Sequence, residues 1–271
     1  MTPYEIFLFV SIMAMQAVLC LLVYARQLYR RLPLFALYSA TMLVSSMALG
    51  IIFGRFGFQT DISYYATWVV IAVTILVRSL AVAELCHESL RVYRGIWALT
   101  WRLLCVVALV FFIHAAIDAR GQPDWFATYS ITAERDVDIA SAFIVVAMLL
   151  IGVYYQLPVS PLHTAVGLGI CVFCVIDFAN YSILRDVLAK YAYSFQVWRA
   201  HINQVNVAWN TVRTLAGDLA IAIWCFALRK PLPEPAEAPV LLPAGVYQQM
   251  SPAINLRLRA FNDRLAELLK P

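Results

Sequence analysis

The chain has 271 residues, of which 63% are hydrophobic and only 13% are charged, and its formal net charge is +4. Water-soluble domains carry about 25% charged and about 45–50% apolar residues, so this composition excludes an ordinary soluble domain. The small positive charge follows from the loop bias of membrane proteins and does not indicate a nucleic acid partner.

Long apolar stretches follow one another along the whole chain. A hydrocarbon core about 30 Å thick requires about 20 apolar residues per helix. The predicted spans are 4–24, 34–53, 64–86, 96–117, 137–157, 163–184 and 206–228. Barrel strands would instead alternate apolar and polar residues over about ten positions. The sequence therefore predicts an all-α, polytopic membrane protein in which residues 1–230 form a bundle of seven transmembrane helices.

The first span, residues 4–24, is predicted to remain in the mature protein as an uncleaved anchor. No basic segment precedes this span, and no small-residue cleavage site follows it. Its length also exceeds the apolar region of about 7–15 residues that is typical of secretory signal peptides.

Basic residues gather in the loops after the first and third spans and in the C-terminal tail. They are Arg26, Arg30, Arg31, Arg91, Arg94, Arg102, Arg229, Lys230, Arg257, Arg259, Arg264 and Lys270. The opposite loops mix arginine with acids, among them Glu134, Asp136 and Asp138 around the start of the fifth span. Because basic loops stay in the cytoplasm, we predict a bacterial inner-membrane protein with its N-terminus outside and its C-terminus inside.

Charged side chains at membrane depth cost at least about 2.5–3.5 kcal/mol and usually face a partner or water. The third span contains Arg78 and Glu84, the sixth contains Asp177, and the seventh contains Arg213 and Asp218. Counted from the span ends at about 1.5 Å per residue, Arg78 and Asp218 share one depth, and Asp177 and Arg213 share another. We therefore predict two ion pairs, Arg78–Asp218 and Asp177–Arg213, that link these three spans.

Asparagines on the sixth and seventh spans extend this polar region. The candidate intramembrane polar cluster comprises Arg78, Asp177, Asn180, Asn210, Arg213 and Asp218. It has two interpretations, namely ion pairs that only set the helix register, or a partly hydrated pocket for a small ligand, ion or proton. Glu84 and His87, near the inner end of the third span, are predicted to snorkel or to be solvated.

The sequence lacks the residues that several activities require. The seventh span contains no lysine for a retinal Schiff base, and the histidines are scattered at His87, His114, His163 and His201. Cys171 and Cys174 form a CxxC on the sixth span, for which packing between helices is favoured over a redox or metal pair. We therefore expect no enzymatic activity, no cofactor and no resident metal.

The C-terminal tail divides into two segments. Residues 231–251 are rich in proline and are predicted to form a stiff, extended linker. Residues 252–271 are predicted to form an amphipathic cytoplasmic helix, because Ile254, Leu258 and Phe261 recur at helical spacing. This helix would bind the membrane surface, a partner protein or the inner face of the bundle.

Three motifs relate the chain to a group of proteins. They are the basic turn YARQLYRRLPLFALY, the segment AERDVDIA at the start of the fifth span, and WNTVRTLAGDLAIAIWCFAL in the last span. In these motifs and in its layout the chain resembles bacterial seven-transmembrane-helix membrane proteins of unknown function. The resemblance implies the fold and a membrane location and carries no activity.

These observations lead to a ranked set of functional hypotheses. The first is a non-enzymatic, receptor-like sensor or an accessory subunit of a membrane complex. The alternative is a small-solute transporter with a polar site between the third, sixth and seventh spans. An enzyme with a site around Glu84 and His87 ranks last, because no nucleophile or metal constellation accompanies them. The expected partners are the lipid bilayer and either a membrane-complex partner or a second copy.

Overall fold

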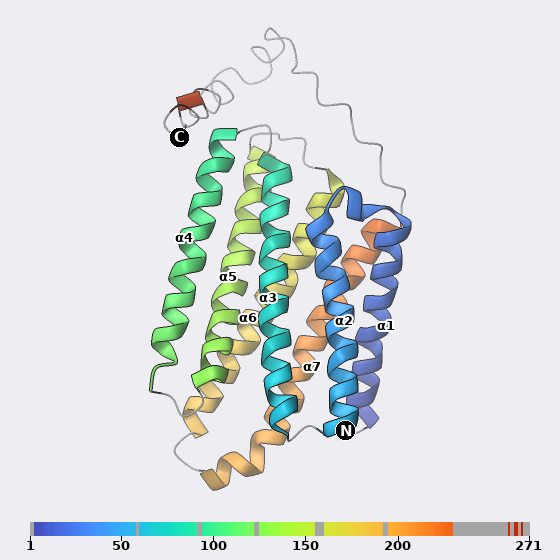
Figure 1. Cartoon of the computed structure of the whole chain (residues 1–271), viewed down its shortest axis with the longest axis vertical. Coiled ribbons are helices and arrows are strands. Elements are labelled where there is room, and N and C mark those ends of the chain that lie inside the picture. The colour runs from blue at the N-terminus through green and yellow to red at the C-terminus, as the bar shows by residue number, and fades with distance from the viewer. Residues whose placement is uncertain are drawn as a thin grey trace.

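The computed structural model describes residues 3–57, 60–90, 94–121, 125–154, 160–191 and 195–229, and also residues 260, 263, 264 and 267. These residues form seven long helices and no strand, so the predicted all-α bundle is confirmed (Figure 1). The helices are α1 (Pro3–Ala25), α2 (Pro33–Phe56), α3 (Asp61–Leu90), α4 (Arg94–Asp118), α5 (Trp125–Tyr154), α6 (Pro161–Tyr191) and α7 (Phe195–Leu228), with a 3-10 turn, η1 (Leu28–Arg30), after α1.

Six of the described helices, all except α5, are long and apolar enough to cross a membrane, as in a multi-pass membrane protein. Helix α5 begins at Trp125, well before the predicted start at Val137, and carries a charged segment in its first half. The predicted linker 231–251 lies outside the described residues. So does most of the predicted helix 252–271, of which only residues 260, 263, 264 and 267 are described, as helical.

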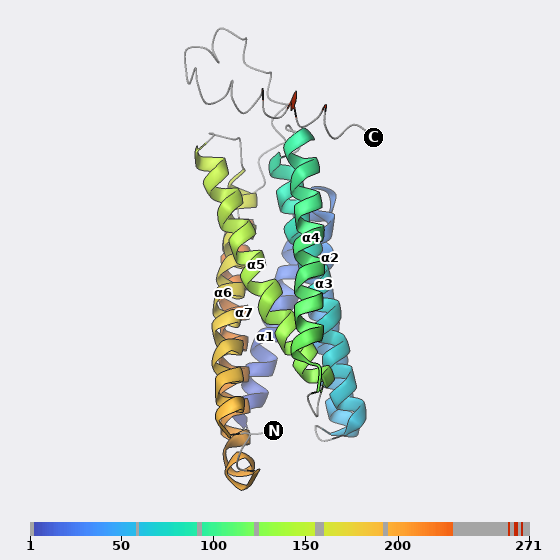
Figure 2. The same ribbon diagram turned by 90° about the vertical axis from the view of Figure 1, so that its left-hand side faces the viewer.

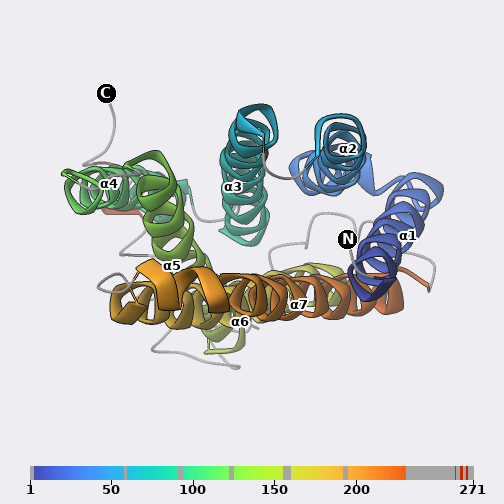
Figure 3. The same cartoon turned by 90° about the horizontal axis from the view of Figure 1, so that it is seen from below.

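The helices pack as a ring with one helix outside. Helix α1 contacts α2, and the contacts continue through α3, α5, α6 and α7 back to α1. Helix α4 lies outside this ring and packs mainly against α5 (Figure 3). Helix α5 runs obliquely from the layer of α6 and α7 at one end to α3 and α4 at the other (Figure 2). Side chains of α5 can therefore meet residues of both layers.

An aromatic cluster joins α2, α6 and α7. The Trp224 ring is edge-on to Phe35 at 5.2 Å and to Tyr38 at 6.2 Å between ring centroids. Its Nε1–H donates a hydrogen bond of 3.1 Å to the Val166 carbonyl, so the buried indole leaves no polar atom unpaired. The ring lies directly against the backbone of Gly169, where a Cβ atom would fall 2.1 Å from Nε1.

The prediction that Glu84 snorkels or is solvated is wrong, because its side chain is buried. Helix α2 begins with Leu32 as its N-cap residue, which has no side-chain oxygen to accept from the first free N–H groups. Glu84 of α3 does so instead, accepting hydrogen bonds from the N–H of Leu34 at 2.9 Å and of Phe35 at 2.8 Å. His87, by contrast, is exposed as predicted. The negative carboxylate also lies favourably at the positive end of the α2 dipole.

Glu84→Ala is expected to lower the free energy of unfolding by about 2 kcal/mol, because it leaves two helix-end N–H groups without an acceptor. The measurement is detergent-induced unfolding in mixed micelles. Glu84→Gln is the matched control, since its amide oxygen still accepts one of the two bonds and should retain part of the stability. Equal losses in the two variants would contradict the capping role.

Candidate functional site

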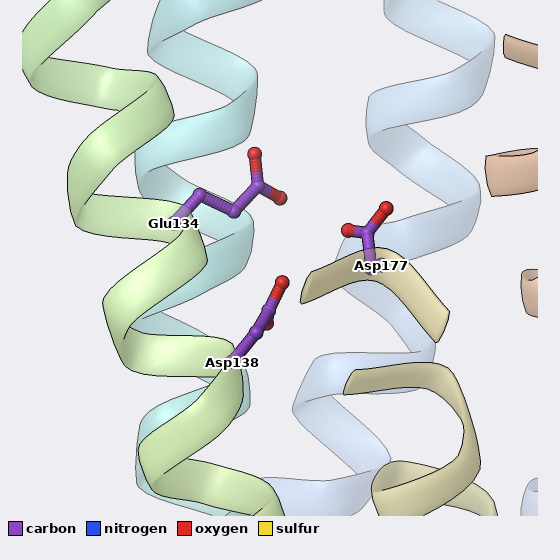
Figure 4. Close-up of side chains that lie close together, drawn as sticks. All are labelled: Glu134, Asp138 and Asp177. Carbon is purple, nitrogen blue, oxygen red and sulfur yellow. The ribbon is translucent and has the colours of Figure 1, made fainter. Parts of the chain in front are cut away.

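Three acidic side chains from two helices converge inside the bundle. Glu134 and Asp138 lie one turn apart on α5 and point toward Asp177 of α6 (Figure 4). Carboxylate oxygens of all three lie within 4.8 Å of one another. All three residues are buried, with Asp138 and Asp177 fully enclosed. The i, i+4 spacing on α5 places both of its acids on one helix face.

Arg213 of α7 binds Glu134, the acid nearer the start of α5. Its Nη2 donates to Glu134 Oε1 at 2.5 Å and its Nη1 donates to Glu134 Oε2 at 3.3 Å, which is a two-pronged arrangement. Nη1 also donates to the Tyr181 hydroxyl, which in turn donates to Glu134. The guanidinium carbon lies 5.4 Å from the Tyr181 ring centroid and 5.6 Å from that of Trp209. Three side chains, those of Glu134, Tyr181 and Trp209, thus hold the arginine in one orientation.

Arg78 of α3 binds Asp138, one turn further along α5. It forms an ion pair with Asp138 in which the side chains are 1% and 0% exposed. The Phe173 ring of α6 lies against the guanidinium, with 5.2 Å between the guanidinium carbon and the ring centroid. The pair connects α3 to α5 inside the bundle, where both side chains are enclosed. We call Arg78, Glu134, Asp138, Asp177, Tyr181 and Arg213 the ionic network.

One of the two predicted ion pairs is present and the other is wrong. Arg213 Nη2 lies 3.9 Å from Asp177 Oδ2, although Glu134 is its nearer partner. Arg78 pairs with Asp138, and Asp218 instead accepts a hydrogen bond of 3.2 Å from the Ser11 hydroxyl of α1. The reason is helix rotation. Asp218 follows Arg213 by five residues on α7, so its side chain points about 140° away from that of Arg213 around the helix axis. Counting depth from the span ends therefore does not fix the face of α7 on which Asp218 lies.

The two predicted asparagines have different surroundings. Asn180 is buried and donates a hydrogen bond of 3.1 Å to the Trp209 carbonyl, so it joins α6 to α7 beside the network. Asn210 is exposed and lies outside the network, which corrects its place in the predicted cluster. Arg78, Asp177 and Arg213 are thus the predicted cluster members that belong to the network.

Sequence reasoning missed Glu134, Asp138 and Tyr181. Both acids lie around the start of the predicted fifth span at Val137, where charge is expected to belong to the outer side of the membrane. The available signal was spacing, since Glu134 and Asp138 are four residues apart, as are Asp177 and Tyr181. Two such pairs are what two facing helices would present to each other.

The network carries an unequal number of opposite charges. Glu134, Asp138 and Asp177 provide three carboxylates, whereas Arg78 and Arg213 provide two guanidinium groups. With all groups ionised, one negative charge has no counter-charge. Within the described part of the chain, the carboxylate oxygens of Asp138 and Asp177 have no hydrogen-bond partner, although Arg78 forms an ion pair with Asp138 and Arg213 lies 3.9 Å from Asp177. Since an unpaired buried charge costs several kcal/mol, this arrangement favours the uptake of one positive charge.

The spacing of the oxygens suits a small cation. Oxygen ligands lie about 2.3–2.6 Å from an ion of calcium size, so opposite ligands are about 5 Å apart. One carboxylate oxygen from each of Glu134, Asp138 and Asp177 lies within 4.8 Å of the other two, inside this limit. A divalent ion would leave the network with excess positive charge, whereas a monovalent ion or a proton would balance it. The geometry therefore fits a single positive charge better than a resident divalent metal.

Comparisons with known proteins give no relative for this chain: no protein-family model, no curated protein and no solved structure matches it.

Proposed function

We propose that this protein is a non-enzymatic, receptor-like or accessory membrane protein whose ionic network takes up one small monovalent cation. The observation that carries the proposal is the charge count of the network, in which three buried carboxylates face two guanidinium groups. Uptake of one positive charge removes the unpaired negative charge. The network residues come from α3, α5, α6 and α7. Uptake of a charge would therefore change contacts among four helices, and so the relative stability of their arrangements.

The proposal is supported by how the network is enclosed. The side chains of Arg78, Glu134, Asp138 and Asp177 are at most 1% exposed, and Arg213 is 22% exposed. Ionisable groups inside a membrane usually mark an ion or proton pathway or a ligand counter-ion. The rings of Phe173, Tyr181 and Trp209 lie against the guanidinium groups. This packing favours binding over catalysis, because catalysis would require room for a substrate beside the charged groups.

The expected result is that a small cation stabilises the purified protein through the network. We would measure thermal unfolding of the full chain in micelles at constant ionic strength, with sodium, potassium or lithium chloride against choline chloride, each over a pH series. A cation at 100 times its Kd should stabilise the fold by about 2.7 kcal/mol. If the cation is a proton, the folded state holds more protons than the unfolded chain, so stability falls as pH rises.

Asp177→Asn should abolish this response, because it removes the surplus negative charge and leaves two carboxylates facing two guanidinium groups. Asp218→Asn is the matched control, since Asp218 lies inside the bundle but bonds to Ser11 outside the network. It should leave the cation and pH response unchanged. An identical response of the wild type and of a folded Asp177→Asn protein would contradict the proposal.

A small-solute transporter is the second candidate, and the four-helix extent of the network favours it. The network contacts helices of both layers, so movement of one layer against the other would change access to it. The sequence prediction included Asp218 in this site; we propose Asp138 and Asp177 in its place, because Asp218 bonds to Ser11 outside the network. Cation binding together with cation-driven solute flux into vesicles would favour transport, and binding without flux would favour the receptor or accessory role.

We further propose a bacterial inner membrane location with the N-terminus outside and the C-terminus in the cytoplasm. Arg26 donates hydrogen bonds to the carbonyls of Leu228 at 3.1 Å and Arg229 at 2.6 Å, so the basic turn after α1 and the end of α7 lie at the same end of the bundle. Arginine is concentrated at this end, which supports its placement in the cytoplasm.

A further inference from the structure

An apolar groove lies between α3, α4 and α5, apart from the ionic network. It has a volume of about 180 Å³ and is walled almost entirely by aliphatic and aromatic side chains. Two serines contribute to the wall, and the hydroxyl of one of them, Ser79, donates a hydrogen bond of 2.8 Å to the Ile75 carbonyl of its own helix. The groove therefore offers hydrocarbon contacts and little hydrogen bonding.

The groove opens at the depth of the hydrocarbon core. Leu76 and Leu104 line it and lie near the middle of the apolar spans α3 and α4. Leu76 is also 59% exposed and Trp101 is 46% exposed, so the walls continue onto the outer surface of the bundle. Because the surroundings at this depth are lipid chains, the groove communicates with the interior of the bilayer.

The position of α4 explains why the groove exists. This helix is the least buried of the six candidate spans and touches α3 only lightly. Polar contacts hold one of its ends to α5, where His114 Nδ1 lies 2.6 Å from Asp136 Oδ2 and the Thr132 hydroxyl donates to Asp118 at 2.7 Å. Away from that end, small side chains such as Ala108 and Ala140 leave space between the helices.

The volume and chemistry of the groove select its occupant. Water needs two to four polar partners, which these walls do not provide, whereas apolar cavities of about 150 Å³ bind ligands of benzene size. A partner helix is about 10–12 Å across with its side chains and cannot enter such a space. We propose that the α3–α4–α5 groove binds a single hydrocarbon chain of a membrane lipid.

The test uses the purified full chain in nanodiscs of phosphatidylcholine and phosphatidylglycerol that contain a phospholipid with a photoactivatable diazirine in its acyl chain. After illumination, labelled residues are mapped by peptide mass spectrometry. Labelling should concentrate on groove residues such as Cys105 and Ile144, above the level at exposed apolar residues of α1 such as Phe7 and Leu21. Uniform labelling of all exposed apolar residues would overturn the proposal, and this comparison requires no variant.

A variant that fills the groove provides the second arm. Ala108→Phe should lower groove labelling by about tenfold. This is the loss of affinity expected when the added ring keeps roughly two methylene groups of the lipid chain from being buried in the groove. Ala116→Phe is the matched control on the same helix, because Ala116 is exposed and does not line the groove. Unchanged groove labelling in a folded Ala108→Phe protein would overturn the proposal.

Discussion

Replacing Arg78 with methionine is expected to lower the free energy of unfolding by about 3–5 kcal/mol, the usual effect of removing one partner of a buried ion pair. Asp138, which is fully buried, would lose its closest counter-charge. The network as a whole would then hold three carboxylates against the single guanidinium of Arg213. The measurement is detergent-induced unfolding of wild type and variant in mixed micelles, followed by circular dichroism.

Two controls separate charge balance from general damage. Arg55→Met makes the same substitution at an exposed position near the end of α2 and should change stability by no more than about 0.5 kcal/mol. Asp138→Asn removes a negative charge from a network that has one in excess, so it should cost less than Arg78→Met. The reverse order, with Asp138→Asn the more damaging change, would refute the charge count on which the proposed cation site depends.

The second large effect is expected at Gly169, where alanine should destabilise the bundle by about 3 kcal/mol, at the upper end of the range for overpacking. The added Cβ would fall 2.1 Å from Trp224 Nε1 and 2.7 Å from Cε2 of the same ring. The ring has little freedom to move away, because it donates a hydrogen bond to Val166 and packs against Phe35. Unfolding in mixed micelles gives the loss, and near-ultraviolet circular dichroism reports the tryptophan environment.

Gly54→Ala is the control for helix propensity. No atom lies within 4 Å of a Cβ built at Gly54, so alanine should be neutral or should stabilise α2 by up to about 1 kcal/mol. The double variant Gly169→Ala, Trp224→Phe should recover part of the lost stability, since the smaller ring frees space at α6. A Gly169→Ala protein as stable as the wild type would show that the α6–α7 contact differs from the one described above.

Sequence reasoning located the helices well because transfer into a bilayer is decided locally. A stretch of about 20 apolar residues is enough to define a span, whatever its neighbours are. The predicted ranges 34–53 and 96–117 therefore lie within α2 and α4. Helix α5 is the exception, because its charged first half is stabilised by contacts with other helices, which local hydropathy does not reveal.

Position along the helix axis could likewise be read from the sequence, and the side chain that each charge meets could not. Depth counting brought Asp177 and Arg213 together correctly, and it failed for Arg78 and Asp218 because partners also depend on which face each helix turns to its neighbours. Spacing of i, i+4 indicates a shared face but does not identify the helix opposite. By itself, the sequence determined that this is an all-α membrane bundle with charged residues inside it. Only the tertiary structure decided that three carboxylates and two guanidinium groups share one enclosed network, because helix rotation and packing set the contacts between residues far apart in the chain.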